Sequence, residues 1–338
     1  MMENATLALL GSFTTPSNSR PSLKSLRYYF HVAVTLLSIV GISGNSIVVL
    51  VLVFHRHLRK KLTTVLILNQ SVVDLTCSVL LLITYAYEAE SPIKKYLTHA
   101  DKVACLLLDA KLLLFCSLNA SNLCLVVITM ERYLMIVHPI KHRNWITKMR
   151  LVAMATAGWL LGWIWNAAPT IPYVWIAKRK CIAFRWPDKE LQSTFGVVYT
   201  VGTFLLPVFF IVFAYSHMLI VLRKRSSQVG DVTNNVKKLS SAQMNLTKTM
   251  VVVTVVFLLC WTPNQIYYLL YNLGFKLRLG SPSWLVTQYL CFINCCFNPF
   301  VYAYKYEGVK AVLKKKLCSQ KNSSNRQPPT LSNESPNV

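Results

Sequence analysis

Seven long apolar stretches dominate the sequence. Each has about the 20 mostly apolar residues that an α-helix needs to cross a lipid bilayer. The chain has 338 residues, of which 54% are hydrophobic and 14% charged, and its mean hydropathy is positive. The segments outside the stretches are short, so we expect a membrane protein without a soluble domain. The stretches are 28–54, 63–87, 103–137, 149–173, 192–222, 250–273 and 284–304.

The formal net charge of +24 is concentrated in alternate loops. In a soluble protein this excess would suggest nucleic acid as a partner, but basic residues beside membrane spans mark the cytoplasmic side. We therefore expect a multi-pass plasma-membrane protein that contacts membrane lipids and no nucleic acid. Its N-terminus is extracellular and its C-terminus cytoplasmic on this reading. The basic residues that decide the orientation include Arg56, Arg59, Lys60, Lys61, Lys141, Arg143, Lys148, Arg150, Arg223, Lys224, Arg225, Lys237, Lys238, Lys310, Lys314, Lys315 and Lys316.

Four segments follow from this pattern. They are an extracellular tail at 1–27, a seven-span domain at 28–305, a short amphipathic helix at 306–318 and a disordered cytoplasmic tail at 319–338. Asn4 begins an N-glycosylation sequon on the outer side. Cys318 follows a basic run, so we expect palmitoylation there; the alternative is an unmodified cytosolic thiol.

Two of the ten cysteines are placed to form a disulfide. Cys105 lies at the outer end of the third stretch and Cys181 in the loop between the fourth and fifth. Both face an oxidising compartment, so we expect them to pair. Seven others lie inside the stretches, where cysteine packs as a small apolar residue.

Charged residues inside the stretches mark candidate functional sites, because a charge in a bilayer is costly. Asp74 lies in the middle of the second stretch; Asp109 and Lys111 lie near the outer end of the third, and Glu131 and Arg132 near its inner end. Amide and hydroxyl residues at the depth of Asp74 indicate a site for a small hard cation, most simply sodium. The alternative is a neutral hydrogen-bonded network that holds the helices together. The predicted sodium ligands are Asp74, Asn45, Ser121, Asn294 and Asn298.

Four stretches contain a proline, which removes a helical hydrogen bond and bends the helix. Such bends are candidate hinges. Beside them, Phe257 and Trp261 lie one helical turn apart, as do Asn298 and Tyr302, so each pair shares a face. The candidate hinges are at Pro169, Pro207, Pro263 and Pro299.

Seven sets of motif residues occur in order along the seven stretches. They are Gly44-Asn45; Leu68-Asn69 with Asp74; Glu131-Arg132-Tyr133 followed by Pro139; Trp159 with Pro169; Pro207 with Tyr215; Phe257-x-x-Cys260-Trp261-Thr262-Pro263; and Asn298-Pro299-Phe300-Val301-Tyr302. This series resembles the rhodopsin-like family of G-protein-coupled receptors over roughly residues 28 to 318. The resemblance implies an all-α bundle of seven transmembrane helices that is not an enzyme. It also implies an extracellular ligand, a heterotrimeric G protein activated by outward movement of the sixth helix, and an arrestin after phosphorylation of the tail.

The resemblance further implies roles for individual residues. Arg132, held at rest by Glu131, would turn toward Tyr215 and Tyr302 in the active state. Trp261 would relay ligand contact into movement of the sixth helix. The sodium ion held around Asp74 would favour the inactive state. The implied coupling residues are Glu131, Arg132, Tyr133, Tyr215, Asn298, Pro299 and Tyr302, and the implied transmission residues are Phe257, Trp261 and Pro263.

Three features depart from the family pattern. Glu131 replaces the usual aspartate and keeps the charge. No acidic residue occurs between Asp231 and Glu307, so Glu131 carries most of the resting restraint on Arg132, which predicts appreciable basal activity. Cys105 lies 27 residues before Arg132, two more than is usual in the family, so we expect an irregular outer part of the third helix.

The outer face favours a peptide ligand. Basic residues at 178–180, Arg185 and Lys189 surround Cys181, and aromatic and amide side chains follow Pro263. A basic rim over a polar and aromatic cavity suits a peptide with acidic residues or a free carboxylate, and the resemblance leans to the neuropeptide receptors. The predicted ligand-binding residues are Lys111, Leu114, Phe115, Arg185, Trp261, Asn264, Gln265 and Tyr268.

Other ligands and another class of protein remain open. The position that carries an aspartate in amine receptors is Leu114, which disfavours a monoamine, and the seventh stretch has no lysine for retinal. A lipid or a small carboxylate is the alternative ligand, and the basic loop would then be only a solvated face. A secondary transporter is less favoured, because the sequence shows no inverted repeat.

Overall fold

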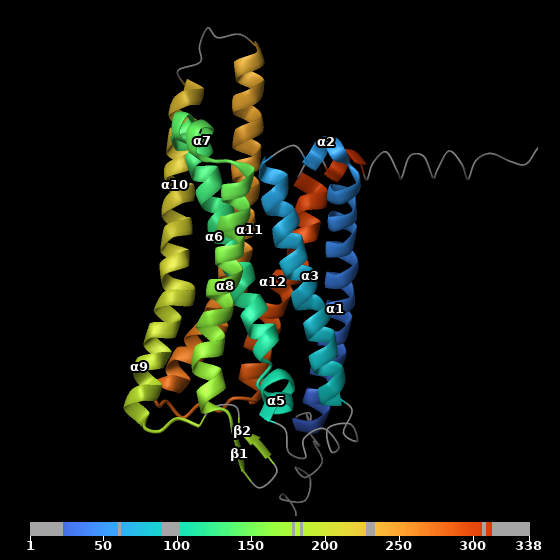
Figure 1. Ribbon diagram of the computed structural model, residues 1–338, viewed down its shortest axis with the longest axis vertical. Helices are drawn as coiled ribbons and strands as arrows, with labels where there is room; N and C mark the ends of the chain where they lie inside the picture. Colours follow the sequence, from blue (N-terminus) through green and yellow to red (C-terminus); the bar gives the residue numbers. More distant parts are fainter. Residues whose placement is uncertain are drawn as a thin grey trace, which may run out of the picture.

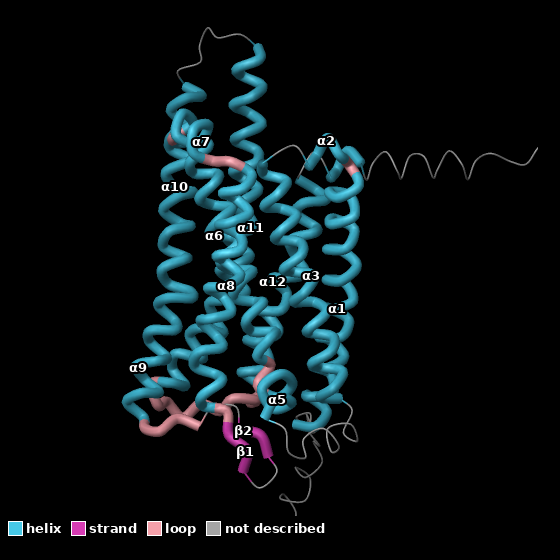
Figure 2. Tube along the Cα trace, in the orientation of Figure 1, coloured by secondary structure: helices cyan, strands magenta, loops and turns pink. Residues whose placement is uncertain are grey.

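The computed structural model describes residues 23–59, 62–89, 102–177, 180–182, 185–227, 234–305 and 309–312. Long helices that run side by side in alternating directions make up nearly all of this part of the chain (Figure 1). One end of the bundle carries a two-stranded hairpin and the other carries the short helix α7, and we call these the hairpin end and the α7 end (Figure 2). Asn4 and Cys318 lie outside the described residues, so glycosylation and palmitoylation there stay predictions.

The first half of the chain forms four of the long helices. The elements are α1 (Leu23–Phe54), α2 (Arg56–Arg59), α3 (Leu62–Ala89), α5 (Lys102–Ala104), the π-helix η1 (Cys105–Asp109), α6 (Leu112–Val137), α7 (Pro139–Trp145) and α8 (Lys148–Tyr173).

The second half begins with the hairpin, and its described residues form three more long helical segments, the first of which joins three consecutive elements over residues 189–227. Strand β1 (Trp175–Ala177) pairs antiparallel with β2 (Lys180–Ile182), with Ile176 opposite Cys181. The helices that follow are α9 (Lys189–Thr200), the π-helix η2 (Val201–Leu205), α10 (Leu206–Ser227), α11 (Asn234–Asn272) and α12 (Pro282–Lys305).

The prediction of an all-helical membrane protein is confirmed for six of the seven spans. Among the described residues, six helical segments are long and apolar enough to cross a membrane: Ser25–Phe54, Thr64–Glu88, Leu112–Val137, Lys148–Tyr173, Lys189–Arg225 and Met250–Asn272. Helix α12 is not among them. It packs between α1 and α11, and buries Gln288, Asn294 and Asn298. Of the short helix expected at 306–318, the structure describes only 309–312, and these residues are helical.

Local sequence signals account for several helix boundaries. Thr147 accepts a hydrogen bond from the Arg150 amide at the start of α8, and Asp188 accepts one from the Leu191 amide at the start of α9. Helix α7 begins at Pro139. The first N–H groups of a helix have no hydrogen-bond partner within the helix, so the N–H that proline lacks costs no hydrogen bond there. Helix α11 ends in a Schellman motif, in which Gly274 has a φ of 88° that a side chain would disfavour.

The third span is irregular at its hairpin end, as expected from the two additional residues after Cys105. The Ala110 amide donates to the Cys105 carbonyl at 2.8 Å, five residues back, which is the wider turn of a π-helix. Lys111 then has a φ of 54°, the left-handed conformation, at a cost of about 1–2 kcal/mol. The span predicted at 103–137 is therefore interrupted, and α6 begins only at Leu112.

Close contact between α6 and α8 fixes the middle of the bundle. A Cβ atom on Gly162 would lie 2.5 Å from the backbone nitrogen of Ala120, so the two helices meet backbone to backbone. Nearby, the Trp159 indole donates to Asn69 Oδ1 at 3.1 Å, which joins α8 to α3. These contacts join α3, α6 and α8 in the middle of the bundle.

Candidate ligand and switch sites

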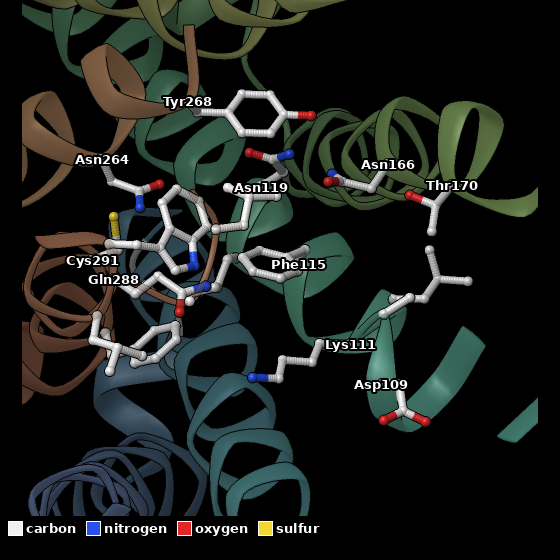
Figure 3. Close-up of a pocket in the computed structure, with 18 of the residues that line it drawn as sticks. Asp109, Lys111, Phe115, Asn119, Asn166, Thr170, Asn264, Tyr268, Gln288 and Cys291 are labelled. Atoms are coloured by element: carbon white, nitrogen blue, oxygen red, sulfur yellow. The ribbon is translucent and has the colours of Figure 1, made fainter. Parts of the chain in front are cut away.

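A cavity of about 450 Å³ opens between the helices toward the hairpin end (Figure 3). Its walls come from α1, α3, α6, α8, α9, α11 and α12. Apolar and aromatic side chains dominate the wall, with amide groups and a few charges among them. The lining includes Arg27, His31, Tyr85, Glu88, Lys111, Leu112, Phe115, Leu118, Asn119, Asn166, Tyr199, Trp261, Asn264, Gln265, Tyr268, Trp284, Gln288 and Cys291.

Most of the predicted ligand-binding residues line this cavity, but two do not. Leu114 is buried in the core between the helices, whereas Leu112, Phe115 and Leu118 of the same helix line the cavity. Arg185 lies outside it, with its guanidinium 5.0 Å from the ring centre of Trp175. The six that line the cavity are Lys111, Phe115, Trp261, Asn264, Gln265 and Tyr268.

Lys111 reaches into the cavity and makes an ion pair there. Its Nζ lies 2.9 Å from Glu88 Oε1 and 4.1 Å from the ring centre of Tyr85, both on α3. The left-handed backbone at Lys111 directs this side chain away from Asp109, as Figure 3 shows. The irregular turn thus places a cation, paired with an acid, in the cavity wall.

Amide and hydroxyl groups form the polar part of the wall. Asn119 donates to the Tyr199 hydroxyl at 2.9 Å, and that hydroxyl donates to Asn166 at 3.2 Å. Among the buried groups of the wall, the Trp261 N–H and Gln265 Oε1 have no hydrogen-bond partner within the described part of the chain. A ligand with both donors and acceptors, such as a peptide, can satisfy them.

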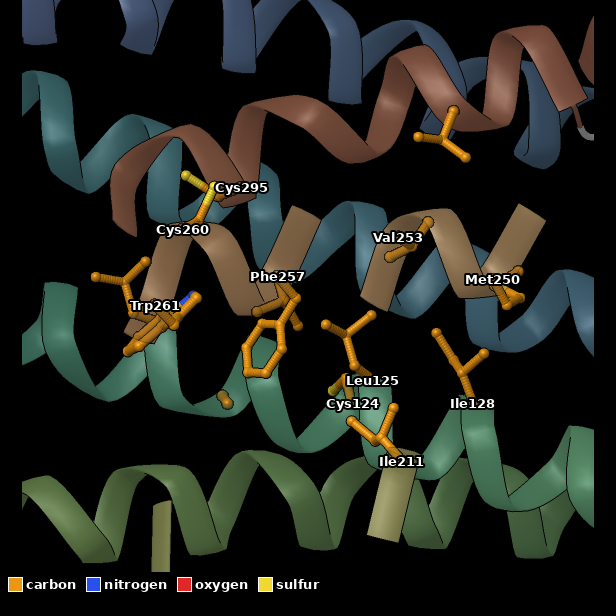
Figure 4. Close-up of a cluster of buried hydrophobic side chains, with 14 of the residues drawn as sticks. Cys124, Leu125, Ile128, Ile211, Met250, Val253, Phe257, Cys260, Trp261 and Cys295 are labelled. Atoms are coloured by element: carbon orange, nitrogen blue, oxygen red, sulfur yellow. The ribbon is translucent and has the colours of Figure 1, made fainter. Parts of the chain in front are cut away.

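A row of buried apolar side chains leads from the cavity floor toward the α7 end. Trp261, Phe257, Val253 and Met250 follow one another along α11 and face α6 and α10 (Figure 4). The Phe257 and Trp261 rings lie 6.1 Å apart, in contact as the one-turn spacing predicts. A shift of Trp261 would therefore be transmitted along this face of α11.

At the α7 end, the paired charges Glu131 and Arg132 are both buried. Arg132 Nε lies 3.4 Å from Glu131 Oε2, and the other carboxylate oxygen lies 3.2 Å from Nε2 of His142 on α7. Glu131 therefore has two partners, one on its own helix and one on the helix that follows.

The tyrosines expected to receive Arg132 contact other groups. Thr129 donates to the Tyr215 hydroxyl at 3.3 Å. Tyr302 packs in a separate apolar cluster with residues of α1, α2 and α3. Tyr133 lies 3.1 Å from Nδ1 of His217, which joins α6 to α10. Within the described residues, no hydrogen bond joins Arg132 to either of the first two tyrosines.

The carboxylate of Asp74 is fully buried at the centre of a polar cluster. Ser121 donates to Oδ1 at 2.7 Å, and Asn298 donates to Oδ2 at 2.8 Å. The Gln70 amide lies 3.2 Å from each of the two oxygens. Asn45 donates instead to the carbonyls of Gly41 and Cys295, each at 3.0 Å.

The donor set around Asp74 suits a small hard cation. It offers carboxylate, hydroxyl and amide oxygens, and among them Asn45 Oδ1 is buried without a hydrogen-bond donor in the described part of the chain. Asn294 is buried on α12, one helical turn before Asn298. These residues fit sodium chemically, and sodium binding stays a prediction.

The disulfide predicted for Cys105 has partial support. Cys105 is disulfide-bonded, and β2, which carries Cys181, packs against η1. The side chain of Cys181 lies outside the described part, so the identity of the partner stays a prediction.

Sequence analysis missed several residues of these sites, among them Gln70, Glu88 and His142, which contact the charged side chains. Gln70 precedes Asp74 by one helical turn, a spacing that brings side chains together and was a usable signal. Glu88 lies just beyond the predicted end of the second span. His142 occurs among basic loop residues, and nothing in its spacing from Glu131 indicates the contact.

Comparison with known proteins finds similarity to seven-transmembrane receptors. A family model described as "7 transmembrane receptor (rhodopsin family)" matches residues 44–302. The chain is 28% identical to the somatostatin receptor type 5 of Bos taurus over 332 residues, which cover 94% of this chain and 82% of the relative. It is 24% identical to the neuropeptide Y receptor type 6 of Mus musculus over 303 residues, 81% of this chain and 76% of the relative. It is also 27% identical to the lysophosphatidic acid receptor 3 of Rattus norvegicus over 215 residues, 63% of this chain and 59% of the relative.

Proposed function

Because the chain belongs to the rhodopsin family of seven-transmembrane receptors, we propose that it binds an extracellular peptide and activates a heterotrimeric G protein. The family is one of receptors, so the chain is a membrane receptor and not an enzyme. Two of the relatives above carry the names of peptide receptors, and the sequence similarity extends over most of this chain.

One observation carries the proposal. Trp261 lines the cavity and is also the first member of the buried row that runs along α11 to Met250. A ligand that displaces the indole therefore pushes on the helix that contains Pro263, the bend about which α11 can move. Outward movement of α11 at the α7 end then opens a space for the G protein beside Arg132.

The orientation follows from the charges. The α7 end is the cytoplasmic end in this proposal, because α7 and the start of α8 carry Lys141, Arg143, Lys148 and Arg150. The hairpin end and the cavity face outward, where a peptide arrives. The tail, once phosphorylated, recruits an arrestin.

The chemistry of the cavity favours a peptide with an acidic group. Lys111 lies in the cavity wall, and a ligand carboxylate can take the place of Glu88 beside it. The amides of Asn119, Asn264 and Gln265 offer donors and acceptors that match peptide bonds. The Tyr268 and Trp284 rings provide apolar contact for the rest of the ligand.

The Asp74 cluster holds a sodium ion in this proposal. Asp74, Ser121 and Asn298 join α3, α6 and α12. An ion bound there supplies a positive charge to the buried carboxylate and stabilises the resting arrangement of these helices. Sodium is then expected to lower the affinity for an activating ligand.

A lipid with an anionic headgroup is the second candidate ligand. The match to the lysophosphatidic acid receptor 3 supports it, and Arg27 and Lys111 are two cations in the cavity lining. Peptide binding is favoured over it because the somatostatin receptor match extends over more of the chain.

The test is nucleotide exchange by G proteins that are reconstituted with the full chain in lipid nanodiscs. A library of synthetic peptides, and separately lysophosphatidic acid, is added as the probe. We expect at least one peptide to accelerate exchange, and we expect Trp261→Leu to abolish the effect. Trp163→Leu, at an exposed tryptophan on α8, is the matched control and keeps the response.

Two outcomes would contradict the peptide proposal. Stimulation by lysophosphatidic acid alone would assign the lipid class. An equal response in wild type and Trp261→Leu would place the ligand away from this cavity.

A further inference from the structure

Gln70 lies at the centre of the Asp74 cluster, although the sequence motifs do not include it. It is fully buried on α3, one helical turn before Asp74. Its side chain points to the same face of the helix as the carboxylate. A glutamine amide here is next to the charge that defines the proposed ion site.

The Gln70 amide nitrogen makes three contacts in this cluster. It lies 2.7 Å from Ser121 Oγ and 3.2 Å from both carboxylate oxygens of Asp74. A primary amide has two hydrogens, so one points to Ser121 and the other is shared between the two oxygens of Asp74. The amide nitrogen therefore lies in front of the carboxylate, equally far from its two oxygens.

The same place in front of a carboxylate is where a small cation binds both oxygens. The N–H of Gln70 and a sodium ion would use the same oxygen lone pairs, so the two cannot bind Asp74 in this manner together. With Gln70 in place, Ser121 and Asn298 supply the remaining donors, and Asp74 has hydrogen bonds to both oxygens without an ion. Gln70 Oε1 has no partner in the described part of the chain, so only the donor end of its amide is held.

We infer that Gln70 is an internal competitor of the cation and sets the affinity of the Asp74 cluster for sodium. When sodium binds, the Gln70 amide leaves the carboxylate and loses its hydrogen bonds to Asp74. The loss of these bonds opposes ion binding, so this receptor requires a higher sodium concentration than the same cluster with an apolar residue at position 70. The inference rests on the proposed sodium site.

The test measures the thermal unfolding midpoint of the full chain in nanodiscs as sodium chloride replaces choline chloride at constant ionic strength. A bound ion stabilises the fold, so the midpoint reports sodium binding without any need for the unknown ligand. Gln70→Leu removes the amide at similar volume, and we expect the half-saturating sodium concentration to fall roughly tenfold, the effect of one hydrogen bond to a charged group. Gln70→Met answers the same question if Gln70→Leu does not fold.

Control variants separate the possible outcomes. Asp74→Asn should lose the sodium effect, and Gln192→Leu, the same change on α9 away from the cluster, should match wild type. An unchanged or increased half-saturating concentration in Gln70→Leu would overturn the role of Gln70 and leave the sodium site intact. The absence of any sodium effect in wild type and in both Gln70 variants would reject the sodium site itself, and the inference with it. Peptide-stimulated exchange would stand in either case.

Discussion

Removal of the Glu131 charge should activate the receptor without a ligand. Glu131 is buried between Arg132 and His142, at 3.4 Å and 3.2 Å. At an effective dielectric constant of about 20, two charges at this separation attract by about 5 kcal/mol, most of which is offset by desolvation. After this offset, the ion pair with Arg132 and the hydrogen bond from His142 together are expected to contribute about 1.5–3 kcal/mol. Because 1.4 kcal/mol is a factor of ten, Glu131→Gln should shift the ratio of active to resting receptor by about 10-fold to 150-fold.

The assay is ligand-free nucleotide exchange at equal receptor density, with a panel of heterotrimeric G proteins. We expect Glu131→Gln to accelerate exchange at least about fivefold, until the active population saturates. Glu190→Gln makes the same chemical change at an exposed position on α9 and is the matched control. Equal rates in wild type, Glu131→Gln and Glu190→Gln would refute the restraint.

His142 provides a second measurement of the same restraint. His142→Ala removes one hydrogen bond to Glu131, worth about 1 kcal/mol, so the increase should be at most about fivefold. In the Glu131→Gln background the same change should add little, because both act through one carboxylate. If His142→Ala raised the exchange rate of Glu131→Gln as much as it raises that of the wild type, His142 would act through a group other than Glu131.

Three further predictions concern the cavity and the bundle. Lys111→Ala should weaken binding of an acidic peptide about tenfold and Glu88→Gln should strengthen it, because Glu88 competes for the same ammonium; competition binding measures both, and unchanged affinities would contradict the pairing. Gly162→Ala should lower the free energy of unfolding by about 1–3 kcal/mol, whereas Gly158→Ala should be tolerated, because its new Cβ would lie 3.7 Å from the nearest atom, Cβ of Leu123. Equal unfolding midpoints for the two variants would count against the close helix contact. In denaturant without reduction, Cys181→Ser should give one more maleimide-reactive thiol than wild type, because its partner is released, and one thiol fewer would mean that the predicted disulfide is wrong.

Much of the bundle could be predicted from hydropathy. The spans beginning near 28 and 63 coincide with α1 and α3 within a few residues, because a bilayer requires a fixed length of apolar helix. Helix α11 begins at Asn234, well before the predicted 250, since a polar helical extension beyond the membrane carries no hydropathy signal.

The irregular turns could be predicted only in part. The count from Cys105 to Arg132 indicated an irregular outer end, but not that Lys111 would adopt a left-handed conformation. Hydropathy does not report which carbonyl an amide donates to, so neither π-helix was foreseen. Leu114, placed by its distance of 18 residues from Arg132 in the family pattern, packs in the core and does not line the cavity.

Polar contacts between distant segments were the least predictable. The contact between Asp74 and Asn298 was expected from the motifs. The contact of Gln70 with Asp74 could have been predicted from their one-turn spacing, but it was overlooked. The contact between His142 and Glu131 depends on how α7 folds back on α6, which no local pattern encodes. Sequence patterns therefore identify residues on one helix face better than residues joined by a turn.

The central claim is that a ligand in the cavity moves α11 away from the bundle at the α7 end. The most direct test is an electron-spin distance measurement between labels at Met149 on α8 and Val252 on α11, both exposed positions. The seven free cysteines of the described residues are buried and should stay unlabelled. With the activating peptide and nucleotide-free G protein, we expect this distance to increase by several ångströms in the wild-type receptor. In Trp261→Leu, we expect the distance to stay unchanged under the same conditions. An unchanged distance in wild type while the peptide still accelerates exchange would contradict the account.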